Sequence, residues 1–136
     1  MAGGARTVRL TVSTGKQAEV IDITARVQQA VKESAVASGL CHVYVPHTTA
    51  GVFINENADP DVMQDLVATL DRLVPWHHQY RHAEGNAAAH IKATLVGTGQ
   101  TVPVEDGRLA LGRWQGIYFA EFDGPRERQL DITVVS

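Results

Sequence analysis

The polar stretch Pro46–Asp61 is the sequence feature that most constrains the fold, because it joins a predicted strand to a predicted helix. The apolar run Leu40–Val45 comes before it, and apolar residues recur at helical spacing from Val62 to Val74 after it. Between them lie a histidine, two threonines, two asparagines, a glutamate and two aspartates. So many polar side chains between core-forming segments are hard to explain by folding alone. We interpret the stretch as one wall of an active site.

Alternating apolar residues predict strands over much of the remaining chain. The first two, Arg6–Ser13 and Glu19–Ile23, are expected to pair as an antiparallel hairpin across a turn at Thr14–Gln17. A tight turn at Glu105–Gly107 predicts a second hairpin. The other predicted strands are Leu40–Val45, Gly51–Ile54, Gln100–Val104, Arg108–Leu111, Gly116–Asp123 and Gln129–Val135.

Capping residues and periodicity predict two main helices. The first covers Ala25–Ser38, with Asp22 or Thr24 as its cap and Gly39 as its stop. The second starts at Asp59, where a short carboxylate can accept from free amides and the following proline fits the first turn. An alanine-rich segment favours a further short helix at Ala87–Val96.

This order of elements predicts one α+β domain over residues 1–136, with mainly antiparallel β-sheet layers and two main helices packed on them. A net charge of −3 provides no basic surface for nucleic acid, and no apolar run approaches the roughly 20 residues that span a membrane. The N-terminal stretch Met1–Arg6 lacks the apolar core of a signal peptide, so we expect a cytoplasmic protein. The lone cysteine, Cys41, starts an apolar strand and is expected to be buried and inert.

Six histidines are candidate metal ligands or proton-transfer groups. His47 opens the polar stretch, His82 follows in an irregular segment rich in histidine, and His90 lies in the alanine-rich segment. Three imidazoles around an ion with an open fourth position form a catalytic zinc arrangement. The spacing matches no compact metal motif. Histidines that lie scattered on the surface or make hydrogen bonds are therefore the alternative.

Other polar residues of the opening stretch indicate phosphate binding and proton transfer. Thr48 and Thr49, followed by Gly51, are typical of a cradle of hydroxyls and backbone amides for phosphate oxygens, although an ordinary turn explains them equally well. The carboxylates and amides that follow can bind a divalent cation, act in acid–base steps, or cap the next helix. Asp59 is expected to cap, whereas Glu56 has no such role and is the better catalytic candidate.

The segment Gly112–Gly116 places an arginine, a tryptophan and a glutamine between two glycines. Arginine can bind phosphate with two parallel hydrogen bonds, and tryptophan can stack on a planar ring. The alternative is a β-turn with a packed tryptophan.

Three long motifs in register resemble the YjbQ family, also called UPF0047. They are the stretch His47–Asp61, the segment His82–Lys92 and the segment Gly107–Tyr118, and Glu121–Arg126 also matches. The resemblance covers nearly the whole chain. It implies a small α+β domain that assembles as a homotrimer, with a pocket lined by histidines that is described as a metal site.

Carried over by position, the resemblance implies that the metal ligands are His47, His82 and His90. His77 and His78 lie outside the matching motifs, and Arg113 stands where threonine is common in the family. The motif residues Trp114 and Gln115 match.

The resemblance also implies a secondary thiamine-phosphate synthase activity, so we expect a metal-dependent enzyme that acts on a phosphorylated small molecule. That reaction joins an aminopyrimidine diphosphate to a thiazole phosphate and releases pyrophosphate. A divalent ion can neutralise the leaving group: zinc is the first expectation, and magnesium is the second, with a diphosphate substrate. In this hypothesis His47 and Glu56 are catalytic, and the substrate contacts are Thr48, Thr49, Asn55, Trp114 and Gln115. The alternatives are a metal-dependent hydrolase and a trimeric, non-enzymatic metabolite-binding protein.

Overall fold

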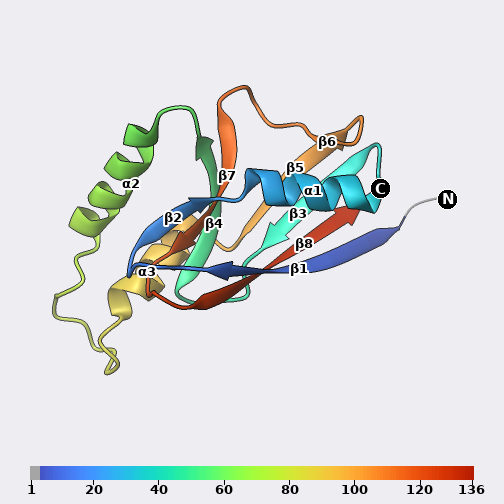
Figure 1. The fold of residues 1–136 in the computed structure, drawn as a ribbon. Coiled ribbons are helices and arrows are strands. Elements are labelled where there is room, and N and C mark those ends of the chain that lie inside the picture. Colours follow the sequence, from blue (N-terminus) through green and yellow to red (C-terminus); the bar gives the residue numbers. More distant parts are fainter. Residues whose placement is uncertain (1–3) are drawn as a thin grey trace.

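Antiparallel strands form most of the structure, a computed structural model that describes residues 4–136 (Figure 1). Residues 1–3, on which part of the signal-peptide prediction rests, lie outside the described residues. Within residues 4–136, a five-stranded sheet has the order β1-β8-β3-β5-β6 and a three-stranded sheet has the order β2-β7-β4. The strands are β1 (Ala5–Ser13), β2 (Glu19–Asp22), β3 (Gly39–Tyr44), β4 (Ala50–Glu56), β5 (Gly99–Glu105), β6 (Arg108–Leu109), β7 (Gln115–Glu121) and β8 (Glu127–Val135). The helices are α1 (Thr24–Ser34), α2 (Pro60–Leu73) and α3 (Ala87–Val96). The predicted α+β class with antiparallel sheets is confirmed.

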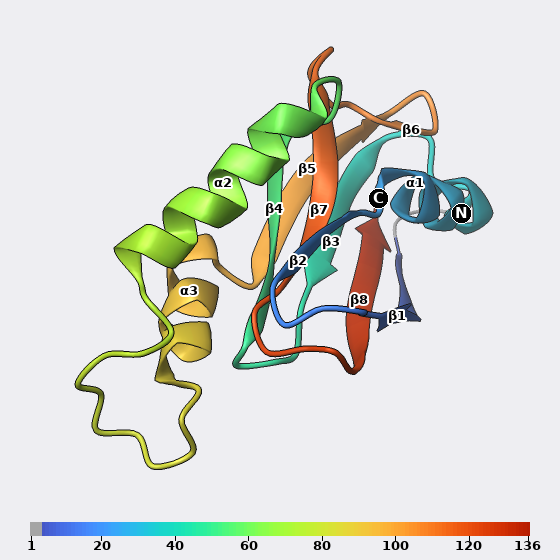
Figure 2. The ribbon, with the colours of Figure 1, turned by 60° about the vertical axis from the view of Figure 1, so that its left-hand side comes forward.

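The three-stranded sheet is the middle layer, and its two faces bury two hydrophobic clusters. One face packs with the five-stranded sheet and α1 around a core that includes Val27, Val52, Phe119 and Ile132, all 0% exposed. Burial of each such side chain stabilises the fold by roughly 1.5–3 kcal/mol. The other face packs against α2 and α3 (Figure 2). The buried members of this second cluster are Ala89, Ala93, Ala120 and Phe122.

The predicted hairpin between the first two strands is wrong. Strand β1 pairs with β8, with Leu10 opposite Leu130, whereas β2 pairs with β7, with Ile21 opposite Phe119. The segment between β1 and β2 therefore carries the chain from one sheet to the other. The physical reason is pairing length: all nine residues of β1 find partners on β8, which the four residues of β2 could not supply.

Local hydrogen bonds set the C-terminal end of α1 and the start of α2. Helix α1 ends earlier than expected, because Ala35 adopts a left-handed φ of 58° and its N–H donates to the Lys32 carbonyl, while Gly39 already belongs to β3. The predicted start of α2 is confirmed: the Asp59 carboxylate accepts from the Asp61 N–H at 2.9 Å. The short third helix begins at the predicted residue.

The segment between α2 and α3 extends away from the two sheets in both ribbon views (Figures 1 and 2). It carries His77, His78 and His82, all exposed. Its local anchor is the Tyr80 hydroxyl, which donates to the Pro75 carbonyl at 2.5 Å. His82 is therefore placed by a connecting segment, whereas His90 is placed by a helix.

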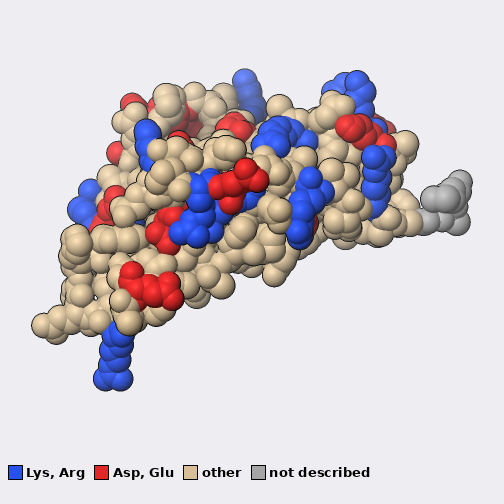
Figure 3. Space-filling model, turned by 60° about the horizontal axis from the view of Figure 1, so that its bottom comes forward, with Lys and Arg blue, Asp and Glu red and all other residues tan. Residues whose placement is uncertain are grey.

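Lys and Arg side chains are interspersed with Asp and Glu side chains on the face of the described residues turned forward in Figure 3. One exposed pair joins the edge strand β1 to its neighbour β8, where the Arg9 guanidinium donates to the Asp131 carboxylate at 2.7 Å. Among the described residues, no helix is long and apolar enough to cross a bilayer.

Candidate functional site

Strand β4 divides the predicted site residues between its two ends. Its register on β7 places Ala50 opposite Glu121 at one end and Glu56 opposite Gln115 at the other. Seven extended residues span roughly 20 Å. We call the first group the histidine end (His47, Thr48, Thr49, His82 and His90). We call the second group the tryptophan end (Asn55, Glu56, Trp114 and Gln115).

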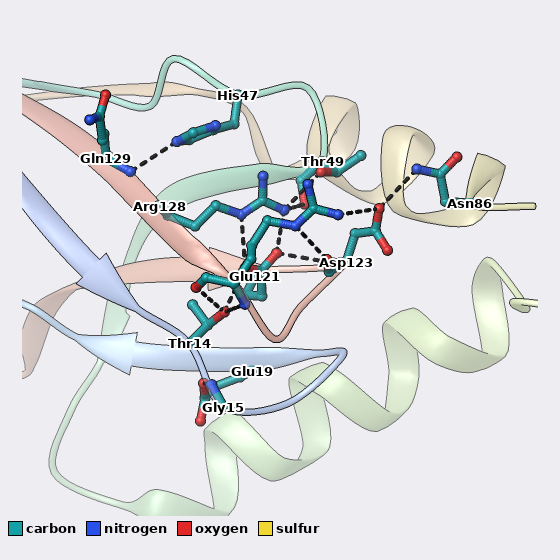
Figure 4. A network of polar contacts seen from close by, with 11 residues as sticks. Thr14, Gly15, Glu19, His47, Thr49, Asn86, Glu121, Asp123, Arg128 and Gln129 are labelled. Atoms are coloured by element: carbon teal, nitrogen blue, oxygen red, sulfur yellow. Dashed lines mark hydrogen bonds and ion pairs between the residues drawn. The ribbon is translucent and has the colours of Figure 1, made fainter. Parts of the chain in front are cut away.

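A buried ion pair between Glu121 and Arg128 organises the histidine end (Figure 4). The Glu121 side chain is 0% exposed and that of Arg128 is 3% exposed. Glu121 accepts from Arg128 Nε at 2.8 Å, from Arg128 Nη2, from the Thr14 hydroxyl at 2.8 Å and from the Asp123 N–H at 3.0 Å. Burial alone would raise the pKa of Glu121, but these hydrogen bonds outweigh it and the net pKa is lowered. The carboxylate therefore stays ionised and fixes the guanidinium.

Sequence reasoning missed both members of this pair, although the strand pattern of β8 contained a signal. Arg128 occupies the inward position that alternates with the buried Leu130, Ile132 and Val134. A charge at an inward strand position requires a partner, because a lone buried ion is strongly destabilised. The partner, Glu121, ends the predominantly apolar β7.

Thr49 is buried against this ion pair and is not exposed to solvent. The residue is 5% exposed, its hydroxyl oxygen accepts from Arg128 Nη2 at 2.8 Å, and its carbonyl accepts from the same nitrogen at 3.3 Å. The neighbouring Thr48 is exposed. Of the two predicted phosphate-binding hydroxyls, the one on Thr49 thus holds Arg128 in place, and the one on Thr48 faces solvent.

His47 is half-buried, and a backbone hydrogen bond fixes its ring. Its Nε2 accepts from the Gln129 N–H at 2.9 Å. A ring nitrogen that accepts carries no proton, so the proton of the neutral imidazole is on Nδ1. Burial first, and then the positive charge of Arg128, lowers the pKa of His47. The ring is neutral at pH 7 and presents Nδ1–H as a donor.

His82 and His90 lie against each other, with ring centroids 5.2 Å apart and an interplanar angle of 80°. Helix α3 places His90 at the histidine end, because Asn86, at the start of this helix, donates to the Asp123 carboxylate at 2.8 Å, and His82 lies against His90 from the connecting segment. Asp123 in turn donates its N–H to Glu121. The other amide atom of Asn86, Oδ1, is buried and accepts from no described residue.

The donor set does not fit the predicted metal site within one chain. Among residues 4–136, no group of three or more His, Cys, Asp or Glu side chains is arranged to hold a metal ion. The lone pair on Nε2 of His47 is occupied by the Gln129 N–H, and Nδ1 carries the proton. His82 and His90 lie in contact. His47, with its proton on Nδ1, is a hydrogen-bond donor and offers no free lone pair to a metal ion.

At the tryptophan end, the side chains make mostly local hydrogen bonds. The Asn55 side-chain oxygen accepts from the Glu56 N–H at 2.7 Å, and the Glu56 carbonyl accepts from the Tyr118 hydroxyl at 3.0 Å. Burial, followed by the charges of Asp22 and Glu56, raises the pKa of Tyr118. Both carboxylates therefore lie close enough to act on the Tyr118 hydroxyl.

The Gly112–Gly116 segment forms the turn that was the alternative interpretation. The Gln115 N–H donates to the Gly112 carbonyl at 3.0 Å, and the Gln115 side-chain oxygen accepts from the Gly112 N–H at 2.8 Å. Trp114 is 55% exposed and not packed, and the Arg113 guanidinium lies 4.7 Å from its ring. The indole is accessible to a planar ligand or to another protein chain.

The fold and the histidine end define a small, two-sheet α+β protein with histidine, asparagine and arginine side chains gathered at one end of its middle sheet. The chain belongs to the UPF0047 protein family, described as YjbQ-like, whose profile matches residues 8–136. The expected family membership is thus confirmed.

Relatives and solved structures of this family are similar over nearly the whole chain. The UPF0047 protein YugU of Bacillus subtilis is 55% identical over 127 residues, which cover 93% of this chain and 96% of that protein. A YjbQ/UPF0047 crystal structure from Clostridium acetobutylicum is 50% identical, with a TM-score of 0.92, and covers 93% of this chain and 98% of its own. A YbjQ-like protein of unknown function from Sulfolobus solfataricus is 33% identical, with a TM-score of 0.95, and covers 98% and 99%.

Proposed function

We propose that this chain is an enzyme that acts on a phosphorylated small molecule at the histidine end. The observation that carries the proposal is the buried Oδ1 of Asn86, which has no donor among the described residues. An unsatisfied buried acceptor costs roughly 1–3 kcal/mol. Such an atom in a native protein calls for an explanation. A ligand N–H or O–H that reaches Asn86 would satisfy it next to two histidines.

Each group at this end has a role in the proposal. His90 is half-buried and His82 is exposed, and they lie in contact, so either can exchange a proton with a bound molecule and with solvent. Asn86 orients the ligand by accepting one of its hydrogens. Asp123 holds the Asn86 amide and the Arg126 guanidinium, which it contacts at 3.1 Å.

The finer proposal is the secondary thiamine-phosphate synthase activity that the family resemblance implies. The aminopyrimidine substrate has an amine that can donate to Asn86 Oδ1, and a histidine can supply a proton to the departing pyrophosphate. The resemblance also implies a divalent ion, zinc or magnesium. Because His47 does not fit as a ligand in its present hydrogen-bonded state, the proposed proton transfer does not depend on such an ion.

Glu56, Asn55, Trp114 and Gln115 remain predicted substrate contacts under this proposal. Within one chain they lie at the opposite end of β4 from His47. In the expected homotrimer, the tryptophan end of one protomer could complete the histidine end of another. The exposed Trp114 is consistent with that role.

The test is a turnover assay that follows pyrophosphate release from the aminopyrimidine diphosphate, with and without the thiazole phosphate. Wild-type protein is compared with His90→Ala, and with His77→Ala as a matched histidine control from the exposed segment. Loss of a proton-transfer group is expected to lower kcat by roughly 10²–10⁴-fold in His90→Ala and to leave His77→Ala unchanged. Full activity in His90→Ala would refute the proposal. Release without the thiazole phosphate would select a hydrolase, and tight binding without turnover would select a metabolite-binding protein.

A further inference from the structure

Two N–H groups at the histidine end point to no acceptor among the described residues. Arg128 makes all of its hydrogen bonds through Nε and Nη2, and Figure 4 shows the other terminal nitrogen, Nη1, without a partner on the His47 side. His47 makes its hydrogen bond through Nε2, which leaves Nδ1–H free. We propose that Arg128 Nη1 and His47 Nδ1 form an anion subsite that binds a phosphate group, so that His47 is a phosphate donor and not a metal ligand.

The buried ion pair gives this subsite its fixed geometry. Arg128 is only 2% exposed, and its guanidinium is held on one edge by a carboxylate that is 0% exposed. Thr49 holds the same guanidinium through its hydroxyl and its carbonyl. Arginine is always charged and is well suited to phosphate oxygens. A guanidinium held on one edge by four hydrogen bonds presents its remaining nitrogen without further loss of side-chain freedom.

The charges around His47 also favour an anion. Besides burial, the positive charges of Arg128 and Arg126 lower the pKa of His47, while Glu121 acts in the opposite direction. Both guanidinium groups therefore lie close enough to act on the ring. Arg128 acts on the ring more strongly than Glu121 does, and Arg126, which is itself paired with Asp123, acts in the same direction as Arg128. The two guanidinium groups together therefore favour an anion beside the ring.

The tautomer of His47 decides whether its ring can act as a phosphate donor or as a metal ligand. A metal ligand needs a free lone pair on one ring nitrogen and carries its proton on the other. If Nδ1 bound a metal, Nε2 would have to carry the proton, and that proton would meet the Gln129 N–H at a separation of 2.9 Å between the two nitrogens. The backbone of β8 therefore selects the donor form of Nδ1. The sequence pattern around His47 could not show this, because Gln129 is 82 residues away.

This inference rests on the proposed function, because it assumes that the bound phosphate group belongs to a substrate. Phosphate binding can nevertheless be tested apart from activity. The probes are inorganic phosphate, pyrophosphate, acetate as a carboxylate control, and zinc ion. Long-range ¹H–¹⁵N correlation spectra of the full chain report which ring nitrogen of His47 carries the proton. We expect the Nδ1–H tautomer in free protein, saturable shifts of His47 and Arg128 side-chain signals with phosphate or pyrophosphate, and weaker shifts with acetate.

Three results would overturn the inference: an Nε2–H tautomer, zinc binding at His47 that excludes phosphate, or no saturable shift up to tens of millimolar phosphate. Equal binding of acetate would also overturn the assignment to phosphate. His47→Ala is expected to weaken phosphate binding by about tenfold to hundredfold, because it removes a hydrogen bond to a charged group, with His77→Ala as the matched control.

A paired variant tests the arginine without leaving a charge buried alone. Glu121→Gln with Arg128→Met removes both charges and keeps similar volumes, so the fold is expected to survive. Phosphate binding should then be lost, and unchanged binding in this folded variant would contradict the inference. Phosphate bound at His47 without any turnover would leave the subsite intact and remove the proposed function. Turnover by the wild-type protein, together with unchanged phosphate binding in His47→Ala, would leave the proposed function intact and remove the subsite.

Discussion

Replacing Arg128 by alanine is expected to destabilise the chain more than any change to an exposed ion pair. The substitution leaves the Glu121 carboxylate, 0% exposed, without its two hydrogen bonds to the guanidinium. It also removes the donor to the Thr49 hydroxyl and carbonyl. Removing one partner of a buried pair typically costs about 3–5 kcal/mol, because the remaining charge is uncompensated.

That loss is large relative to the total stability of a domain this size. A folded domain is usually stable by about 5–15 kcal/mol. For a chain of 136 residues, a loss of this size corresponds to a fall in Tm of roughly 10–20 °C. The paired Glu121→Gln, Arg128→Met variant should recover most of the loss, because it leaves no charge buried without a partner.

Urea unfolding followed by circular dichroism, at one fixed protein concentration, measures these changes. The control is Arg9→Ala, which breaks the Arg9–Asp131 pair, where the arginine side chain is 55% exposed. An exposed pair contributes only about 0.2–1 kcal/mol, so this variant should stay close to wild type. The reasoning would be refuted if Arg128→Ala lost no more stability than Arg9→Ala, or if the paired variant were no more stable than Arg128→Ala.

Three further predictions follow from individual contacts. Asp59→Ala removes the carboxylate that accepts from the Asp61 N–H and should cost about 1 kcal/mol in the same urea experiment, whereas Asp59→Asn should keep most of that stability. Burial raises the pKa of the Cys41 thiol to about 11, so the native protein should not react with a thiol reagent at pH 8, and rapid labelling of folded protein would contradict this. Because folding lowers the pKa of His47, its contribution to stability is complete above the unfolded pKa of about 6.5 and is lost as pH falls through the folded pKa. Stability measured from pH 7 down to pH 5 should therefore fall less in His47→Gln than in wild type.

Local signals in the sequence predicted the elements better than their pairing. Asp59 followed by Pro60 marked the start of α2 because the cap is made by neighbouring residues. The partner of β1 could not be read the same way, since Leu10 pairs with Leu130 from the far end of the chain. Hairpin pairing is the natural expectation for adjacent strands, and here it is overridden by a longer partner strand.

In the candidate site, too, single residues could be predicted from the sequence better than their contacts. The sequence singled out His47, His82 and His90 individually, and the structure brings His82 and His90 into contact. It did not reveal that Gln129, from β8, fixes the ring of His47. The roles of these side chains depend on backbone groups contributed by distant strands, and residue type and spacing carry little information about such groups.

The location of a bound diphosphate tests the central claim most directly, namely that the histidine end is the functional site. The measurement is a crystal structure of the full chain grown with pyrophosphate. We predict pyrophosphate oxygens within hydrogen-bond distance of His47 Nδ1 and Arg128 Nη1. Pyrophosphate bound at Trp114 and Glu56, with no ligand contact to the histidine end of any protomer, would contradict the account.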